Sequence, residues 1–337
     1  MGQAGSLKID IFTHILPIKY KQALDDNFPG HLQQATNAAV PTLWDLDHRF
    51  RIMDKYGVMN VLTLCRPPIE EITTDAKKAL DLTKAANDEM AELVLKYPIK
   101  FPAAIAALAL NDVDGSLKEL ERTIVDLKFR GVQLYSHVNH KPLDSPEFEP
   151  IYEMMSRYNL PILIHPSTGI TYTDYKGEKE SKYMVAATFG WPYETTAAMT
   201  RLIFSGILER WPNLKVITHH AGGMVPYYAD RIRAFQDNRE MVGRGKDRVG
   251  LTKAPIDYYK MFYADTALYG NAPALMLGRA FFGVDHLLFA TDFPFAGEYG
   301  ERVTRKTIEA IEEMDISDVE RRKVYEDNAI SVFRLPV

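Results

Sequence analysis

The sequence predicts a (β/α)8 barrel, in which eight parallel strands close into a ring that helices surround. Strand-like apolar runs alternate with amphipathic helical stretches along the chain, and this alternation indicates a parallel sheet. Eight such runs occur, which is the number that closes a barrel. Four of the runs end in the motifs Thr13-His14, His165-Pro166, His219-His220 and Thr291-Asp292, and these distant side chains can meet only where parallel strands end at one rim.

Each strand is expected in a run rich in β-branched or large apolar residues. The eight runs are Leu7–His14, Met59–Leu64, Phe101–Leu108, Gly131–Ser136, Pro161–His165, Lys215–His219, Lys260–Asp265 and His286–Asp292. Between them, stretches such as Asp81–Lys96 and Asp114–Phe129 place apolar residues at i, i+3 and i+4, which is typical of helices. A doubly wound open sheet is the alternative, but no Gly-x-Gly-x-x-Gly loop follows any of the strands.

Two long stretches follow strands and are expected to form a lid and the walls of a pocket. They are Pro17–Trp44 after the first strand and Ser167–Tyr193 after the fifth. Neither internal repeats nor linker-like composition marks a boundary. Residues 1–337 are therefore expected to form one barrel domain with lid insertions.

Composition narrows the range of partners. The 337 residues are 46% hydrophobic and 25% charged, and their net charge is -5 with no basic stripe, so nucleic acid is not an expected partner. No apolar run reaches the roughly 20 residues that span a bilayer. The one cysteine, Cys65, excludes an internal disulfide and fits a reducing compartment. With no signal-like segment at its start, the protein is expected in the cytoplasm.

The strand ends carry a candidate metal site. Metal-ligating residue types stand at four of them, in Thr13-His14, His165-Pro166, His219-His220 and Thr291-Asp292. Imidazole nitrogens and a carboxylate are ligands of divalent ions such as zinc. Gathered at the rim of a barrel, they predict a metal centre at the face where barrel enzymes have their active sites.

Six short motifs, in a fixed order, resemble those of a known family. They are His137–Asn139, His165-Pro166, Gly190–Thr196, His220–Gly223, Phe262–Asp265 and Thr291–Phe295, and they follow the opening segment Ile9–Pro17. In this order and at these strand ends, they resemble the amidohydrolase-2 family, and within it the group of aminocarboxymuconate-semialdehyde and aromatic-acid decarboxylases. The resemblance covers almost the whole chain. It implies a metal-dependent barrel that performs non-oxidative decarboxylation of unsaturated or aromatic carboxylates.

The resemblance also implies roles for individual residues. His14, His165 and Asp292 match metal ligands, so one divalent ion is expected, with zinc preferred and manganese as the alternative. His220 matches a catalytic histidine beside the metal, which moves a proton, and Asp292 is expected to assist catalysis. His219 precedes His220 and is expected to point to the opposite side of the backbone and to pack in the core, although a shift of one residue in register would exchange the two.

Phe12 departs from the family pattern, because it occupies a position where relatives have a metal ligand. Phenylalanine has no lone pair to give to a metal, so Phe12 is expected instead at the edge of the substrate site. Three outcomes are open. The ion is held by His14, His165, Asp292 and water; or Asp10 or His220 fills the vacancy; or metal binding is lost.

Further expectations concern substrate and partners. Arg231 matches an arginine that reaches into the pocket of a neighbouring subunit and binds a carboxylate, which would imply a homodimer; a surface salt bridge with Asp230 or another acid is the alternative. Trp191 and Phe295 are expected either to contact a planar small-molecule carboxylate or to pack in the core at the rim of the barrel. The expected reaction is decarboxylation. The alternatives are hydrolysis or hydration on the same scaffold, or a metal-depleted binding protein because of Phe12.

Overall fold

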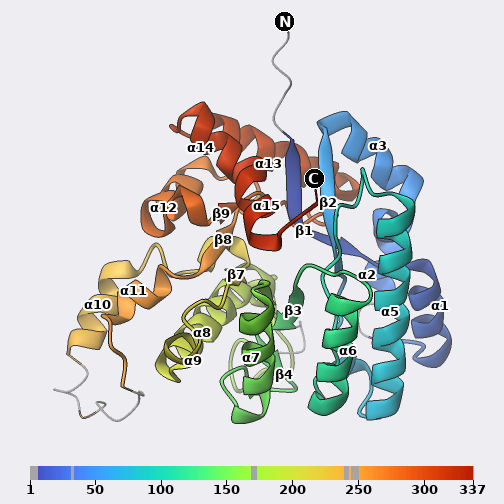
Figure 1. Ribbon diagram of the computed structural model, residues 1–337, viewed down its shortest axis with the longest axis horizontal. Coiled ribbons are helices and arrows are strands. Elements are labelled where there is room, and N and C mark those ends of the chain that lie inside the picture. Colours follow the sequence, from blue (N-terminus) through green and yellow to red (C-terminus); the bar gives the residue numbers. More distant parts are fainter. Residues whose placement is uncertain (1–6, 32–33, 168–172, 239–242, 244–249, 337) are drawn as a thin grey trace, which may run out of the picture.

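The computed structural model describes residues 7–31, 34–167, 173–238, 243 and 250–336. It is a (β/α)8 barrel, as the sequence predicts. Figure 1 shows the helices following one another around the central strands, from blue on the right through green below and yellow on the left to red at the top. None of the helices in these described ranges is long and apolar enough to cross a bilayer.

Seven strands of the ring are regular and pair in parallel with their neighbours: β1 (Lys8–Ile15), β2 (Val58–Leu64), β3 (Val132–Tyr135), β6 (Ile162–His165), β7 (Val216–Thr218), β8 (Tyr263–Asp265) and β9 (Leu287–Leu288). The ring closes between the first and the last, where Thr13 bridges Phe293 in parallel and the His14 amide donates to the Phe293 carbonyl at 2.7 Å. A short antiparallel hairpin, β4 (His137–Val138) with β5 (Lys141–Pro142), lies outside the ring.

The expected strand over 101–108 takes its place in the ring without regular strand geometry. It joins β2 to β3 through single parallel bridges, Leu62 to Ala104 and Ala106 to Val132. The segment is rich in alanine and contains Pro102, which has no amide hydrogen to donate, so its local preference for strand is weak. Its neighbours on both sides supply the pairing that keeps it extended.

The helices cover the outside of the ring. Their bounds are α1 (Ile18–Asn27), α2 (Gln34–Ala39), α3 (Leu46–Tyr56), α4 (Ile69–Ile72), α5 (Ala76–Lys96), α6 (Val113–Val125), α7 (Glu149–Tyr158), α8 (Trp191–Phe204), α9 (Ile207–Arg210), α10 (Ala229–Asp237), α11 (Pro255–Tyr259), α12 (Ala272–Phe282), α13 (Glu301–Glu313), α14 (Asp318–Arg322) and α15 (Asn328–Phe333). Three of them begin at an aspartate whose carboxylate accepts from backbone amides of the first turn, namely Asp45, Asp75 and Asp112.

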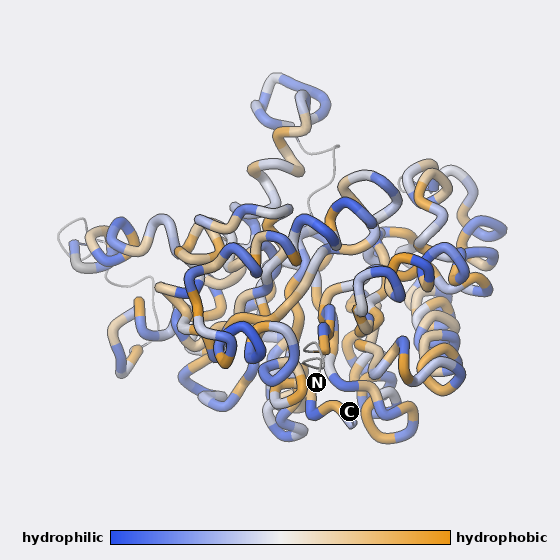
Figure 2. Tube along the Cα trace, turned by 90° about the horizontal axis from the view of Figure 1, so that it is seen from above, coloured by the Kyte–Doolittle hydropathy of each residue, from blue (hydrophilic) through white to orange (hydrophobic). Residues whose placement is uncertain are grey.

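The apolar core has two parts. The larger lies between the strands and the surrounding helices. The smaller fills the inside of the ring and includes Val61, Leu163, Ile217 and Leu288, together with Phe333 of α15, which closes the end of the barrel where the strands begin. In the view from above (Figure 2), hydrophilic stretches lie mainly along the outer helices and loops. The polar side chains of the site lie at the opposite end, where the strands finish.

Candidate metal centre and pocket

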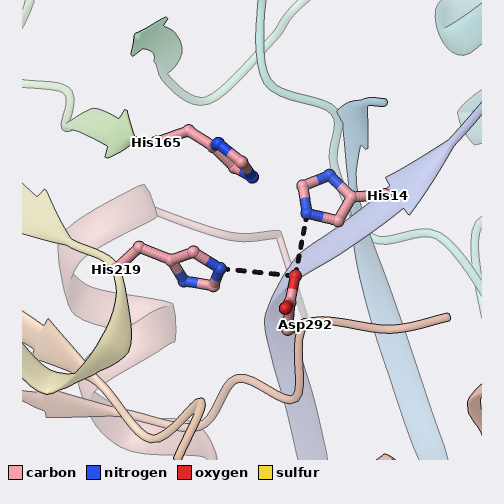
Figure 3. A group of neighbouring side chains, drawn as sticks. All are labelled: His14, His165, His219 and Asp292. Atoms are coloured by element: carbon pink, nitrogen blue, oxygen red, sulfur yellow. Dashed lines mark hydrogen bonds and ion pairs between the residues drawn. The ribbon is translucent and has the colours of Figure 1, made fainter. Parts of the chain in front are cut away.

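Four buried side chains converge where the strands end. His14 is the penultimate residue of β1 and His165 ends β6, while His219 follows β7 and Asp292 follows β9. Figure 3 shows the three imidazoles and the carboxylate pointing toward one another from separate strands. One potential ligand atom from each lies within 4.8 Å of all the others. We call these four residues the metal cluster.

The alternation of strand residues explains why these four side chains meet. Each stands two positions after a residue whose side chain lies in the apolar core inside the ring: Phe12 before His14, Leu163 before His165, Ile217 before His219 and Ala290 before Asp292. Side chains two apart on a strand share a face, so each cluster residue points inward, one step nearer the rim. The four apolar residues form a layer of the core that lies one step further from the rim than the four polar ones.

His14 and Asp292 contact each other directly. The Nε2 of His14 donates to the Oδ1 of Asp292 at 3.1 Å, and the Oδ2 of Asp292 accepts from the hydroxyl of Tyr269 at 2.7 Å. Asp292 has a φ of +64°, a left-handed conformation that is uncommon for a residue other than glycine. Such strain is characteristic of functional sites, where the surroundings hold a residue in place.

His165 has one nitrogen committed and one available. Its Nδ1 lies 2.6 Å from the carbonyl oxygen of Pro166 and donates to it. In the neutral ring this leaves the Nε2 lone pair facing the cluster, as a metal ligand requires. Burial lowers the pKa of His165 well below its usual range, so the ring is neutral and able to coordinate.

His219 belongs to the cluster, and the expectation that it packs away from the site is wrong. Its Nδ1 donates to the carboxylate of Asp265, which also accepts from the amides of Ala221 and Ala267. Its Nε2 is buried without a hydrogen bond, although it lies 3.3 Å from the Oδ1 of Asp292. A carboxylate holding one nitrogen of a histidine while the other faces a site is the arrangement of metal-bound histidines.

The charges favour a cation at the centre of the cluster. Burial opposes protonation of His219, but Asp265 and Asp292 outweigh it and raise the pKa of His219 to about 10. Burial also disfavours charge on Asp292, yet His219 and His14 hold the pKa of its carboxyl well below the usual range. Three imidazoles and a carboxylate, with one unpartnered nitrogen aimed inward, fit a divalent metal ion.

Phe12 occupies the floor of the cluster. Its ring is fully buried and stacks on the imidazole of His219, with centroids 4.1 Å apart and planes inclined by 15°. The expectation that Phe12 lines the substrate site is not met, because among the described residues the pocket is lined by others. Its flat face instead helps to orient His219.

Neither of the two residues expected to replace the missing ligand does so. The Asp10 carboxylate accepts from the amide of Phe12 at 3.2 Å and from the amide and hydroxyl of Thr291. Burial raises the pKa of Asp10 to about 7. His220 also stands outside the metal cluster. The fourth potential ligand atom of the cluster belongs to His219.

His220 faces the pocket beside the cluster. The chain turns at this residue, which has a φ of +55°, so that consecutive histidines take different directions. Its ring lies 4.0 Å from that of His219 and 6.3 Å from that of Trp191, measured between centroids. Burial lowers the pKa of His220 to about 4, and its Nδ1 is buried without a hydrogen bond. A neutral imidazole in this position can take up and release a proton.

A pocket of about 690 Å³ opens over the metal cluster. Its floor is formed by His14, His165, His219 and Asp292. Trp191 and Phe295 belong to its walls, as expected, with Leu268, Met184 and Cys65. This volume lies within the usual range for small-molecule sites, as does the combination of apolar walls with a few polar groups. Arg231 does not line the pocket; it is exposed on α10 and covers the ring of Phe235.

Two further arginines lie near the site. Arg49 of α3 is fully buried and donates to the carbonyl oxygen of His14 at 2.8 Å and to Asn60 at 3.1 Å. Arg66 follows β2 and lines the pocket. The signal for Arg66 was its place directly after a strand end. Nothing in the helical pattern around Arg49 separates it from surface charge.

Comparison with known proteins agrees with this geometry. The profile of the family described as Amidohydrolase matches residues 9–335. A 2-amino-3-carboxymuconate-6-semialdehyde decarboxylase of Dictyostelium discoideum is 27% identical over 98% of this chain and 92% of its own. A gamma-resorcylate decarboxylase of Polaromonas sp. strain JS666 is 28% identical over 86% of this chain and 87% of its own.

Solved structures are similar over the whole chain. A 2,6-dihydroxybenzoate decarboxylase in complex with 2,6-dihydroxybenzoate superposes with a TM-score of 0.80, at 26% identity, over 98% of this chain and 99% of the other. A dihydroxybenzoic acid decarboxylase from Polaromonas sp. JS666, with bound manganese and 2-nitroresorcinol, has a TM-score of 0.79 at 26% identity, over 98% and 97% of the two chains. The motifs, the barrel and the family match agree, and the chain belongs to the amidohydrolase family.

Proposed function

We propose that the protein is a metal-dependent decarboxylase that removes carbon dioxide from an aromatic or unsaturated carboxylic acid. The observation that carries the proposal is a buried cluster of three histidines and one aspartate at the floor of a largely apolar pocket, with the neutral imidazole of His220 beside it. The relatives named above are decarboxylases of such acids, which supports the same reaction here.

One divalent metal ion is expected to be held by His14, His165, His219 and Asp292. Zinc is the ion that we favour, because nitrogen ligands with one carboxylate suit it, and manganese, present in the related Polaromonas structure, is the alternative. When bound, such an ion polarises a substrate oxygen and stabilises the negative charge that develops as the carbon–carbon bond breaks.

The residues of the chain supply binding and proton transfer. Trp191 and Phe295 offer apolar surface to a planar substrate and keep water from the reacting carbon. His220 takes a proton from an acidic group of the substrate and delivers it to the carbon that carries the carboxylate. The bond to the carboxylate then breaks, its electron pair restores the unsaturated system, and carbon dioxide leaves. The hydroxyl of Tyr269 holds Asp292 in orientation through its hydrogen bond.

The reaction is tested with a panel of hydroxybenzoates and muconate-like acids, offered to protein loaded with zinc or with manganese. We expect carbon dioxide in the headspace and, in heavy water, one deuterium at the carbon that lost the carboxylate. Turnover of esters, lactones or amides without carbon dioxide release would assign the site to hydrolysis instead. Release that persists after removal of the metal with a chelator would contradict the metal dependence.

The exposed side of α10 supports a homodimer. Arg231 lies there beside Phe235, which is 62% exposed, and close in sequence to Tyr227, which is 75% exposed. Aromatic residues and arginine are enriched in protein interfaces. We infer that this face packs on a second copy and that Arg231 serves the neighbouring pocket. Analytical ultracentrifugation tests the first point, and a monomer at micromolar concentration would contradict it.

We further infer that residues 1–337 work as one domain. This is supported by the closure of the ring between the two ends of the chain and by a family match that spans residues 9–335. A cytoplasmic location stays our expectation, supported by the single cysteine of the sequence, which is buried.

A further inference from the structure

We propose that Arg66 forms an anion subsite of the pocket and binds a carboxylate that the substrate keeps after decarboxylation. The inference rests on the decarboxylase function proposed above and narrows its substrate class. The substrate would be an aromatic or conjugated acid with two carboxylates, one lost over the metal cluster and one retained on Arg66.

The position of Arg66 places a cation in the pocket wall beside the cluster. It is the second residue after β2, and β2 pairs with β1, the strand that carries His14. Arg66 lines the same pocket as the cluster and His220. Its guanidinium carbon lies 5.3 Å from the ring centroid of Trp191, so the guanidinium packs against the face of that ring.

The charge of Arg66 has no carboxylate partner among the described residues. One Nη donates to the carbonyl oxygen of Ser167, and the Nε is buried with no hydrogen bond. Arg122, by contrast, lies 2.8 Å from both Asp88 and Glu119. A guanidinium that is partly removed from water and keeps free donors at a pocket is well suited to a carboxylate, which accepts two parallel hydrogen bonds.

Nearby acids are bound to Ser167, the residue to which Arg66 donates. The hydroxyl of Ser167 donates to Glu71 at 3.0 Å, and its amide donates to Glu194 at 2.8 Å. Neither carboxylate forms an ion pair with Arg66 in the described part of the chain. Ser167 therefore contacts both acids and the arginine, and Arg66, which lines the pocket, is left with charge for a ligand.

Arg66 is suited to the carboxylate that the substrate keeps. A cation on a retained carboxylate keeps its interaction throughout the reaction, and it orients the molecule so that the other carboxylate meets the cluster.

The test compares a dicarboxylate with a monocarboxylate on the metal-loaded protein. Isophthalate and benzoate are titrated, and binding is followed by calorimetry and by intrinsic tryptophan fluorescence. Arg66→Gln keeps a donor for Ser167 but removes the charge and the fork. Arg51→Gln is the matched control, because Arg51 is exposed on α3. Metal content and thermal stability are measured for each variant.

We expect the wild type to prefer isophthalate to benzoate and Arg66→Gln to bind isophthalate about 10- to 100-fold more weakly, as loss of a charge-assisted hydrogen bond predicts. Benzoate binding and metal content should change little, and Arg51→Gln should behave as the wild type. Equal isophthalate affinity in Arg66→Gln and wild type would overturn the subsite while leaving the decarboxylase proposal intact. Absence of carbon dioxide release from every acid, with binding still dependent on Arg66, would overturn the decarboxylase proposal while leaving the anion subsite intact.

Discussion

His219 and His220 are neighbours in the chain, yet the structure gives them different surroundings. Ile217 lies inside the ring, so His219, two positions later, continues on the same face into the metal cluster. His220 comes after the strand has ended, and its positive φ turns it toward the pocket. Resemblance to family motifs identified His220 but not His219, because the motif begins at the second histidine.

The sequence could have revealed His219. The same two-residue step leads from Leu163 to His165 and from Ala290 to Asp292, both of which were predicted. Applying the step to Ile217 would have placed His219 in the cluster. The buried role of Arg49 could not be predicted, because its partners are a backbone carbonyl of β1 and a side chain of β2.

Exchanging the two histidines for asparagine separates their roles. His219→Asn should lower metal affinity by more than the roughly 10- to 100-fold typical of losing a residue that only supports a ligand. His220→Asn should keep the metal and lose turnover, because only proton transfer is removed. Metal content by mass spectrometry and carbon dioxide release are measured on both. The reverse pattern, with metal lost in His220→Asn, would show that the assignment is exchanged.

At the scale of elements, the third strand departs from what its local sequence suggests. The segment over 101–108 was recognised by its place in the alternation, although its alanine content and Pro102 leave it few regular strand bonds. Its extended form depends on β2 and β3 rather than on its own propensity. The sequence therefore predicted that this strand exists, but not that its pairing is irregular.

Helix α4 buries an acid, which makes stability depend on pH. Glu70 is 3% exposed, and burial raises its pKa from 4.5 to about 8, with Glu71 adding to the shift. Between these values the unfolded chain has released the proton that the folded protein keeps. The free energy of unfolding should therefore fall as pH rises, by up to about 1.4 kcal/mol per pH unit from this group.

Glu70→Gln should remove that dependence, so the variant gains stability relative to wild type as pH rises from 5.5 to 7.5. Urea unfolding at several pH values measures the difference. Glu153→Gln, an exposed acid on α7, is the control and should leave the slope unchanged. Parallel curves for Glu70→Gln and wild type would mean that Glu70 is ionised in the folded protein.

At the scale of the whole molecule, the two ends of the barrel have different roles. The end where the strands begin is closed by α15, whose Val332 and Phe333 enter the apolar core inside the ring. The end where the strands finish carries the cluster, the pocket and His220. Stability and chemistry are thus separated along the barrel, as expected for this fold.

Phe333→Ala tests the closed end. Its side chain is fully buried, so the substitution should cost about 3–5 kcal/mol of unfolding free energy and leave metal content unchanged in the folded fraction. Leu95→Ala on α5 is the control, since Leu95 is 82% exposed, and it should change stability by less than about 0.5 kcal/mol. Similar small effects for both would indicate that α15 does not close the ring.

The central claim is that one divalent ion is held by three histidines and an aspartate from four different strand ends. Crystals grown with zinc chloride and measured on both sides of the zinc absorption edge test it most directly. The account predicts one anomalous peak at bonding distance, about 2.0–2.2 Å, from His14, His165, His219 and Asp292. No peak in the cluster, or one that His219 does not reach, would contradict it.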